Sequence, residues 1–190
     1  MPNLVNLHDF APRPTQWLWQ ERIPVGSLSL VDGDPGRGKG LFTCELAARV
    51  TTGRPMYGSD AALPPAGVIL LQGEDPLEEV FARLRACGAN LDRVHVSGRE
   101  DPAVIPDDIQ WLEAAVRENA ARFVVVDPVT SYLGPNVNSD QGVRRALAPL
   151  AAMAGRTEVA VLLVRHLTKG GGSNPLYRGA GSIPSRPSTK

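Results

Sequence analysis

The chain has little of several features that would define other classes of protein. Only two of its 190 residues are cysteines, Cys44 and Cys87, and neither has a partner at metal-site spacing, so the sequence predicts neither a disulfide nor a zinc site. No run of about 18 consecutive apolar residues occurs, which argues against a membrane-spanning helix. Asp9 and Pro12 interrupt the first residues before an apolar core forms, which argues against a signal peptide. We therefore expect a cytoplasmic protein.

The chain also lacks an excess of charge of either sign. Lys and Arg together number 20, as do Asp and Glu, so the formal net charge is zero. This balance argues against a strongly basic nucleic-acid-binding protein, although charge can still be distributed unevenly. The apolar content of 43% and the length suit one globular domain with a buried core.

The most informative segment is residues 33–40, which read G-D-P-G-R-G-K-G. They fit the phosphate-binding P-loop motif G-x-x-x-x-G-K-[ST] at every defined position except the last, and they stand between a predicted strand (27–31) and a predicted helix (41–50), as the motif requires. Glycines let the backbone wrap around phosphate, the helix N-terminus adds partial positive charge, and the lysine reaches the outer phosphates. The alternative is a plain glycine-rich turn. We predict an ATP site formed by Gly33, Asp34, Pro35, Gly36, Arg37, Gly38, Lys39, Gly40 and Leu41.

Apolar runs alternate with amphipathic stretches along the rest of the chain. Strands are predicted at residues 67–72, 93–96, 123–126 and 159–164, with 93–96 as a short edge strand, and helices at 76–87, 106–119 and 141–154. Strands that alternate with helices indicate a mostly parallel sheet covered on both faces, which is a three-layer α/β/α fold.

Two terminal segments are expected to lie outside this domain. Residues 1–19 are predicted to be an extended arm that docks through Trp17, Leu18 and Trp19. Residues 20–183 form the predicted ATPase domain, and the low-complexity tail 184–190 is expected to be disordered.

Acidic residues and a histidine follow three of the predicted strands. Because ligands of parallel sheets bind at the carboxyl ends of strands, these residues are candidates for the site. Asp127, after four apolar residues, suits the Walker B role of holding Mg2+. Glu74 is placed to orient or deprotonate the attacking water, with Asp75 as a substitute or as the cap of the next helix. His166 is either a γ-phosphate sensor or a histidine bonded to backbone.

Four segments together resemble the RecA-like ATPases of the plasmid RepA helicase group. These are residues 17–40, L-L-Q-G-E-D-P at 70–76, R-F-V-V-V-D-P at 122–128, and the segment from 164 to 183 that begins V-R-H-L-T-K-G-G-G. The resemblance implies a RecA-like sheet, Glu74 as catalytic base, Asp127 as the Walker B aspartate and His166 as phosphate sensor. It also implies a homo-oligomeric ring that couples ATP hydrolysis to DNA.

Two departures from that family lead us to expect impaired hydrolysis. Gly40 stands where the family has Ser or Thr, so the hydroxyl that would bind Mg2+ is missing, and Thr43 lies about 4.5 Å further along the helix axis. The family also continues after residue 183 with a further strand and an arginine, and we therefore expect a truncated or frameshifted member. Without that strand, residues 28–31 are expected to form an uncovered sheet edge.

Two other functions stay open. Nucleoside monophosphate kinases begin their P-loop similarly, but Leu41 stands where they have threonine, and no arginine-rich lid segment is evident. A nucleotide-binding module without turnover is the other alternative.

The stretch from residue 159 to 190 contains five basic residues and no acidic one. Any DNA contact is therefore expected there, through Lys169, Arg178 and the loop Gly170, Gly171 and Gly172, because phosphates attract a locally positive region. The alternative is that these charges only solvate a loop.

Overall fold

A parallel five-stranded sheet forms the centre of the molecule. The computed structural model describes residues 6, 8, 10–12, 14–97, 102–134 and 140–166. The strand order is β3-β7-β6-β4-β5. The strands are β3 (Leu28–Gly33), β4 (Gly67–Gln72), β5 (Val94–Ser97), β6 (Ala121–Asp127) and β7 (Ala160–His166).

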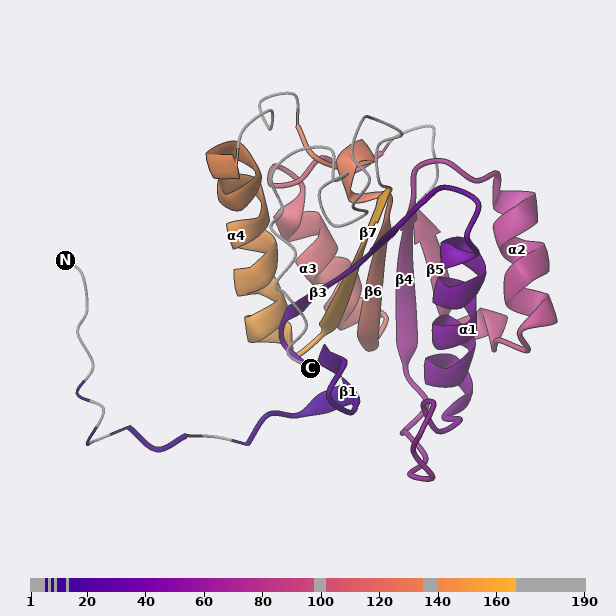
Figure 1. Ribbon diagram of the computed structural model, residues 1–190, viewed down its shortest axis with the longest axis horizontal. Helices are drawn as coiled ribbons and strands as arrows, with labels where there is room; N and C mark the ends of the chain where they lie inside the picture. Colours follow the sequence, from indigo (N-terminus) through magenta and orange to yellow (C-terminus); the bar gives the residue numbers. More distant parts are fainter. Residues whose placement is uncertain are drawn as a thin grey trace.

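Helices cover both faces of this sheet (Figure 1). α1 (Lys39–Thr52) and α2 (Leu77–Ala86) lie on one face, and α3 (Ile109–Glu118) and α4 (Asp140–Thr157) lie on the other. Every residue of β4 is buried, as expected for a parallel strand enclosed on both sides. The two faces carry two apolar clusters, one under each helix layer. The predicted three-layer α/β/α fold is confirmed.

The predicted helices and strands are all present, with shifted ends. α3 buries Ile109, Leu112 and Val116, the face that its apolar spacing predicts. β5 lies at one edge of the sheet, as expected for the short strand. β3 lies at the other edge and, within the described part of the chain, pairs with β7 alone.

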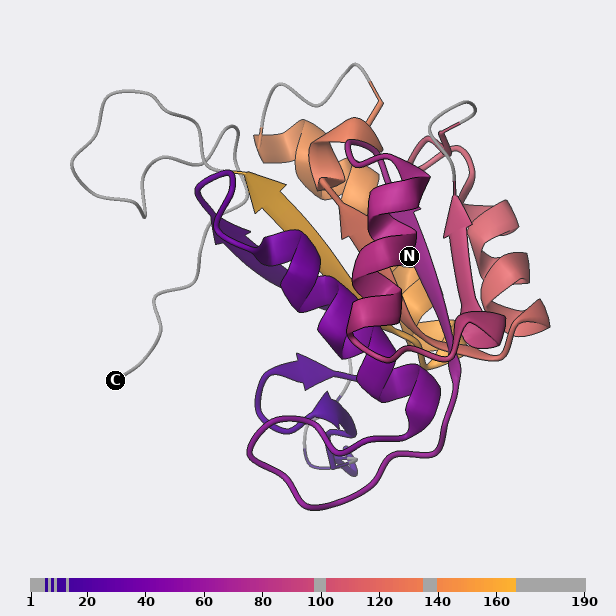
Figure 2. The same cartoon turned by 90° about the vertical axis from the view of Figure 1, so that its right-hand side faces the viewer.

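The end of the expected N-terminal arm is a strand, which the sequence did not indicate. β1 (Trp17–Trp19) pairs antiparallel with β2 (Ile23–Pro24), and Leu18 and Ile23 are buried in the cluster beneath α1. The indole Nε1 of Trp19 donates to the backbone oxygen of Tyr57 at 2.9 Å. Figure 2 shows this hairpin beside the connection that follows α1, at the end of the sheet opposite the tip of β7.

Several expectations fall on residues outside the described ranges. These include the basic positions Lys169 and Arg178, the loop Gly170, Gly171 and Gly172, and the tail 184–190. Among the helices of the described residues, none is long and apolar enough to cross a membrane.

Candidate nucleotide site

A cavity of about 410 Å³ lies at the carboxyl edge of the sheet. It is bordered by the P-loop, the ends of β4, β6 and β7, and one side chain of α2. The lining residues are Pro35, Gly36, Gly38, Lys39, Gly40, Leu41, Gln72, Glu74, Asp75, Arg83, Asp127 and His166. The structure therefore brings together residues from segments that are more than 120 positions apart in the sequence.

Strand register accounts for this convergence. Gly33 of β3 is opposite His166 of β7, and Gln72 of β4 is opposite Asp127 of β6. One position before the first of these pairs, Asp32 accepts a hydrogen bond of 2.6 Å from the buried Arg165 guanidinium. This ion pair joins the strand that leads into the P-loop to the strand that carries His166, and sequence patterns did not reveal it.

The P-loop has the backbone of an anion cradle. Gly36 and Gly38 have φ angles of 72° and 82°, in the left-handed region that side chains other than glycine rarely adopt. A Cβ atom at either position would meet no atom within 4 Å, so both glycines border open space. α1 begins directly after Gly38, and the ammonium of Lys39 donates to the backbone oxygens of Gly33 and Asp34 at 2.8 and 2.9 Å. Helix N-terminus, loop and lysine together fit a bound phosphate.

The end of β4 is held close to the end of β6. The Gly73 amide donates to the backbone oxygen of Asp127 at 2.9 Å. A Cβ atom at Gly73 would lie 2.7 Å from Cβ of Ser131, in the short helix η3 (Val129–Ser131) that follows Asp127. Glycine therefore permits the contact between these segments, and this contact sets where Glu74 lies.

Glu74, His166 and Asp127 form one group of side chains. His166 Nδ1 is 3.7 Å from Glu74 Oε2, and its Nε2 is 3.8 Å from Asp127 Oδ1. Both distances are longer than hydrogen bonds. The Glu74 side chain is 56% exposed, whereas that of Asp127 is 9% exposed. Burial raises the pKa of Asp127, against the opposing effect of His166, and the carboxylates of Asp75 and Glu74 raise it further.

Asp75 does not cap α2, and that expectation is wrong. Pro76 occupies the N-cap position, and the helix has no side-chain cap hydrogen bond there. The Asp75 carboxylate instead accepts a hydrogen bond from Arg83, whose other terminal nitrogen donates to Glu79 at 2.8 Å. Motif reasoning missed Arg83. Its spacing of four from Glu79 places these two residues on one side of α2, whereas Asp75 precedes the helix and no helical spacing predicts its contact with Arg83.

Gly40 lies beneath this ion pair. A Cβ atom at position 40 would lie 3.0 Å from Arg83 Nη1 and 3.4 Å from Asp75 Oδ2. Thr43 is fully buried, and its hydroxyl donates to the Gly40 backbone oxygen at 2.9 Å. The threonine hydroxyl thus bonds to its own helix and does not take the place of the hydroxyl that Gly40 lacks.

The carboxylates at this cavity fit a magnesium ion only if a bound nucleotide supplies phosphate oxygens as further ligands. Among the described residues, no group of three or more His, Cys, Asp or Glu side chains could hold a metal. Mg2+ commonly uses one or two carboxylates together with phosphates and water, and Asp127 at the end of β6 supplies such a carboxylate.

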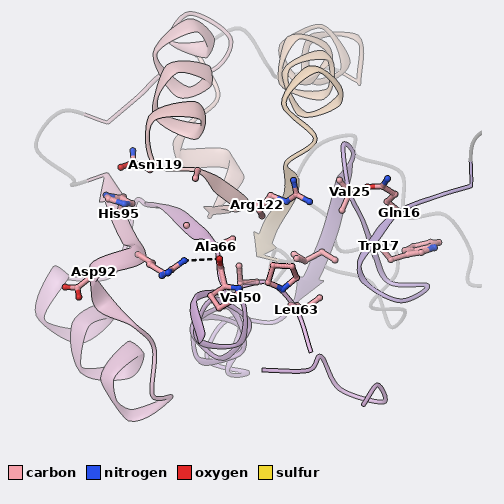
Figure 3. A pocket seen from close by; sticks show the side chains of 16 residues that line it. Gln16, Trp17, Val25, Val50, Leu63, Ala66, Asp92, His95, Asn119 and Arg122 are labelled. Carbon is pink, nitrogen blue, oxygen red and sulfur yellow. Dashed lines mark hydrogen bonds between the residues drawn. The ribbon is translucent and has the colours of Figure 1, made fainter. Parts of the chain in front are cut away.

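A second cavity, of about 540 Å³, lies at the opposite end of the sheet (Figure 3). Gln16, Trp17 and Val25 border it from the hairpin, and Arg122 borders it from the start of β6. Arg93 donates to the Pro65 backbone oxygen at 2.9 Å across one side of it. None of the site residues predicted from the sequence, which are residues 33–41, Glu74, Asp127 and His166, lines this cavity.

Comparison with known proteins finds one family model and several relatives that match most of the chain. A family model described as an AAA domain (AAA_25) matches residues 1–172. The DNA repair protein RadA of Bacillus subtilis is 27% identical over 153 residues, which are 78% of this chain and 30% of that protein. RadA of Mycobacterium tuberculosis is 30% identical over 158 residues, 78% of this chain and 28% of the relative. The chain spans less than a third of the length of these relatives.

We expect the Asp127→Asn variant to be more stable than the parent at pH 7. The unfolded chain releases the Asp127 proton at an ordinary pKa, whereas burial raises the pKa in the folded chain, so folding loses stability as the pH rises above about 4. Asparagine has no proton to lose, and its advantage should therefore shrink as the pH falls toward 4. Thermal melts between pH 4 and 7 measure this, with the exposed Asp60→Asn as control. An Asp127→Asn variant that melts below the parent at pH 7 would contradict the argument.

Proposed function

Because this chain belongs to the AAA domain family, whose model matches residues 1–172, we propose that it binds ATP in the cavity at the P-loop and hydrolyses it slowly. The observation that carries the proposal is the phosphate cradle, in which two left-handed glycines, a helix N-terminus and Lys39 face a cavity bordered by three carboxylates and a histidine. Family membership favours an ATPase over a nucleoside monophosphate kinase.

Each residue at the cavity then has a proposed role. The backbone from Gly33 to Leu41 surrounds the phosphates, and Lys39 exchanges its two backbone acceptors for phosphate oxygens. Asp127 would hold Mg2+, and the metal would supply positive charge to the phosphates. Glu74, exposed at the cavity, orients the attacking water and accepts its proton. His166, between the two carboxylates, senses the γ-phosphate.

Slow hydrolysis is proposed because Gly40 offers no hydroxyl to the metal. The structure supports this, because the Thr43 hydroxyl is bonded within α1. If the rate of hydrolysis is zero, the chain is a module that binds ATP without turnover, which is the alternative function.

DNA is the proposed macromolecular partner. The relatives in Bacillus subtilis and Mycobacterium tuberculosis are DNA repair proteins by name, and they are much longer than this chain. The resemblance of the sequence motifs to the RepA helicase group supports two finer proposals, a helicase role and a homo-oligomeric ring. The names of the RadA relatives support a role in DNA repair as the alternative.

Lys39→Ala should abolish binding of ATP, since the variant loses the cation that the cradle directs at the outer phosphates. Titration of a fluorescent ATP analogue measures the affinity, with Arg145→Ala on the exposed side of α4 as control. We expect a loss of about a hundredfold or more for Lys39→Ala and none for the control. Equal affinity of the Lys39 variant and the parent would remove the P-loop proposal.

Glu74→Gln should bind ATP as well as the parent does and lose whatever hydrolysis the parent has. An amide cannot accept the proton of the attacking water, and such a loss typically lowers turnover about 10²- to 10⁴-fold. Phosphate release measured alongside ATP binding separates the two effects, and Glu78→Gln, exposed in the first turn of α2, is the matched control. Unchanged turnover in Glu74→Gln would mean that Asp75 is the base for the attacking water, or that the site has no such base.

DNA binding, if it uses the basic stretch near residue 170, should weaken with salt. The paired variant Lys169→Glu with Arg178→Glu should lower the affinity for single-stranded DNA and flatten its salt dependence by about 0.7 per lost phosphate contact. The same charge change on α4, Arg144→Glu with Arg145→Glu, is the control. Affinity that does not vary with salt, or that survives the Lys169 and Arg178 changes, would exclude DNA binding by this basic stretch.

A further inference from the structure

An arginine of α2 reaches into the phosphate cavity from outside the P-loop. The Arg83 guanidinium lines the cavity together with Lys39, Gly38 and Gly40. Its side chain is 32% exposed and makes hydrogen bonds to the carboxylates of Asp75 and Glu79. Two carboxylates hold it, yet it remains beside the space in which the P-loop would place phosphates.

Gly40 has no side chain and so leaves room for the guanidinium, which a side chain at this position would displace by a few tenths of an ångström. A Cβ atom at position 40 would be 3.0 Å from Arg83 Nη1, which is closer than ordinary van der Waals contact. In the common P-loop motif this position carries the hydroxyl that binds Mg2+. Here Arg83 places a permanent positive charge next to the position from which that hydroxyl is missing.

The charge of the cavity makes this cation important. Among its described lining residues, the permanently charged cations are Lys39 and Arg83, against the carboxylates of Glu74, Asp75 and Asp127. A polyphosphate brings several more negative charges into the same space. The fork of an arginine suits phosphate oxygens, and charge-assisted hydrogen bonds of this type are about twice as strong as neutral ones.

We propose that Arg83 is a second phosphate-binding cation of the nucleotide site, supplied by the same chain, and that it partly replaces the metal ion in neutralising the outer phosphates. In the nucleotide-free protein Asp75 and Glu79 hold the guanidinium beside Gly40. When a nucleoside triphosphate enters, Arg83 donates at least one terminal N–H group to a phosphate oxygen near Gly40. The inference rests on the proposed binding of ATP and adds to it a residue and a reduced dependence on Mg2+.

The test compares ATP affinity with excess Mg2+ and with EDTA, measured by calorimetry on the full chain. Arg83→Gln should lose about tenfold or more of its ATP affinity in EDTA and less in Mg2+, because the metal then supplies the missing charge. Arg83→Lys keeps a cation and should retain most of the affinity in EDTA. Arg85→Gln, exposed on the same helix, is the matched control and should behave like the parent.

A second variant tests the same idea in the opposite direction. Asp75→Asn removes the carboxylate that competes for the guanidinium, so its ATP affinity in EDTA should rise above that of the parent. A purely structural Arg83–Asp75 pair would instead make both Arg83→Gln and Asp75→Asn lose affinity equally in Mg2+ and in EDTA, and this result would overturn the inference.

The outcomes also separate this inference from the function on which it rests. A parent that binds no ATP in either buffer would overturn both. A parent that binds ATP, together with an Arg83→Gln variant of the same affinity in both buffers, would overturn only the role of Arg83 and leave ATP binding in place.

Discussion

Parallel pairing with matched strand ends is the constraint on which the site depends. Each strand of the sheet ends at the same edge, so residues that follow four different apolar runs come to border one cavity. This alignment is seen in the register, which places Gly33 opposite His166 and Gln72 opposite Asp127. A shift of one residue in the register of either strand pair would turn its side chains to the opposite faces of the sheet, and Glu74, His166 and Asp127 would no longer lie together.

Close packing around two glycines, together with the strand register, determines where the groups of the site lie. At Gly73 the end of β4 approaches the turn after Asp127 more closely than a side chain would allow, and at Gly40 the first turn of α1 leaves room for a guanidinium. At Gly73 the contact requires glycine, whereas at Gly40 a side chain would displace the guanidinium by a few tenths of an ångström. The glycines of the P-loop act differently, because Gly36 and Gly38 are needed for their left-handed backbone and leave the space beside them open.

Charge in the cavity is balanced between groups from different layers. Asp127 is buried at a strand end, where ionisation is unfavourable, as the raised pKa of its carboxyl indicates. Lys39 and Arg83 approach from the P-loop and from α2, and His166 lies between Glu74 and Asp127. An ionised Asp127 lowers the stability of the protein without a ligand. Such a cost is typical of residues that serve a binding site.

The sequence by itself determined the parts that depend on local backbone geometry and on hydrophobic periodicity. The P-loop could be predicted because its glycines and lysine act through the backbone between one strand and the next helix, and the buried strands could be predicted from their continuous apolar runs. From these strands followed the candidates Glu74, Asp127 and His166, since the ends of parallel strands share an edge. The convergence of these three on one cavity was thus foreseeable, although their distances were not.

Only the tertiary structure decided the contacts between side chains of separate elements. The hairpin of β1 and β2 was missed because two short strands carry too few residues to show a period, and they are defined by packing beneath α1. The pairs of Arg83 with Asp75 and of Arg165 with Asp32 depend on which way long side chains turn. The position of Arg83 over Gly40 depends further on how α2 packs against α1, a contact that no local pattern contains, because it arises from the burial of both helices on one face of the sheet.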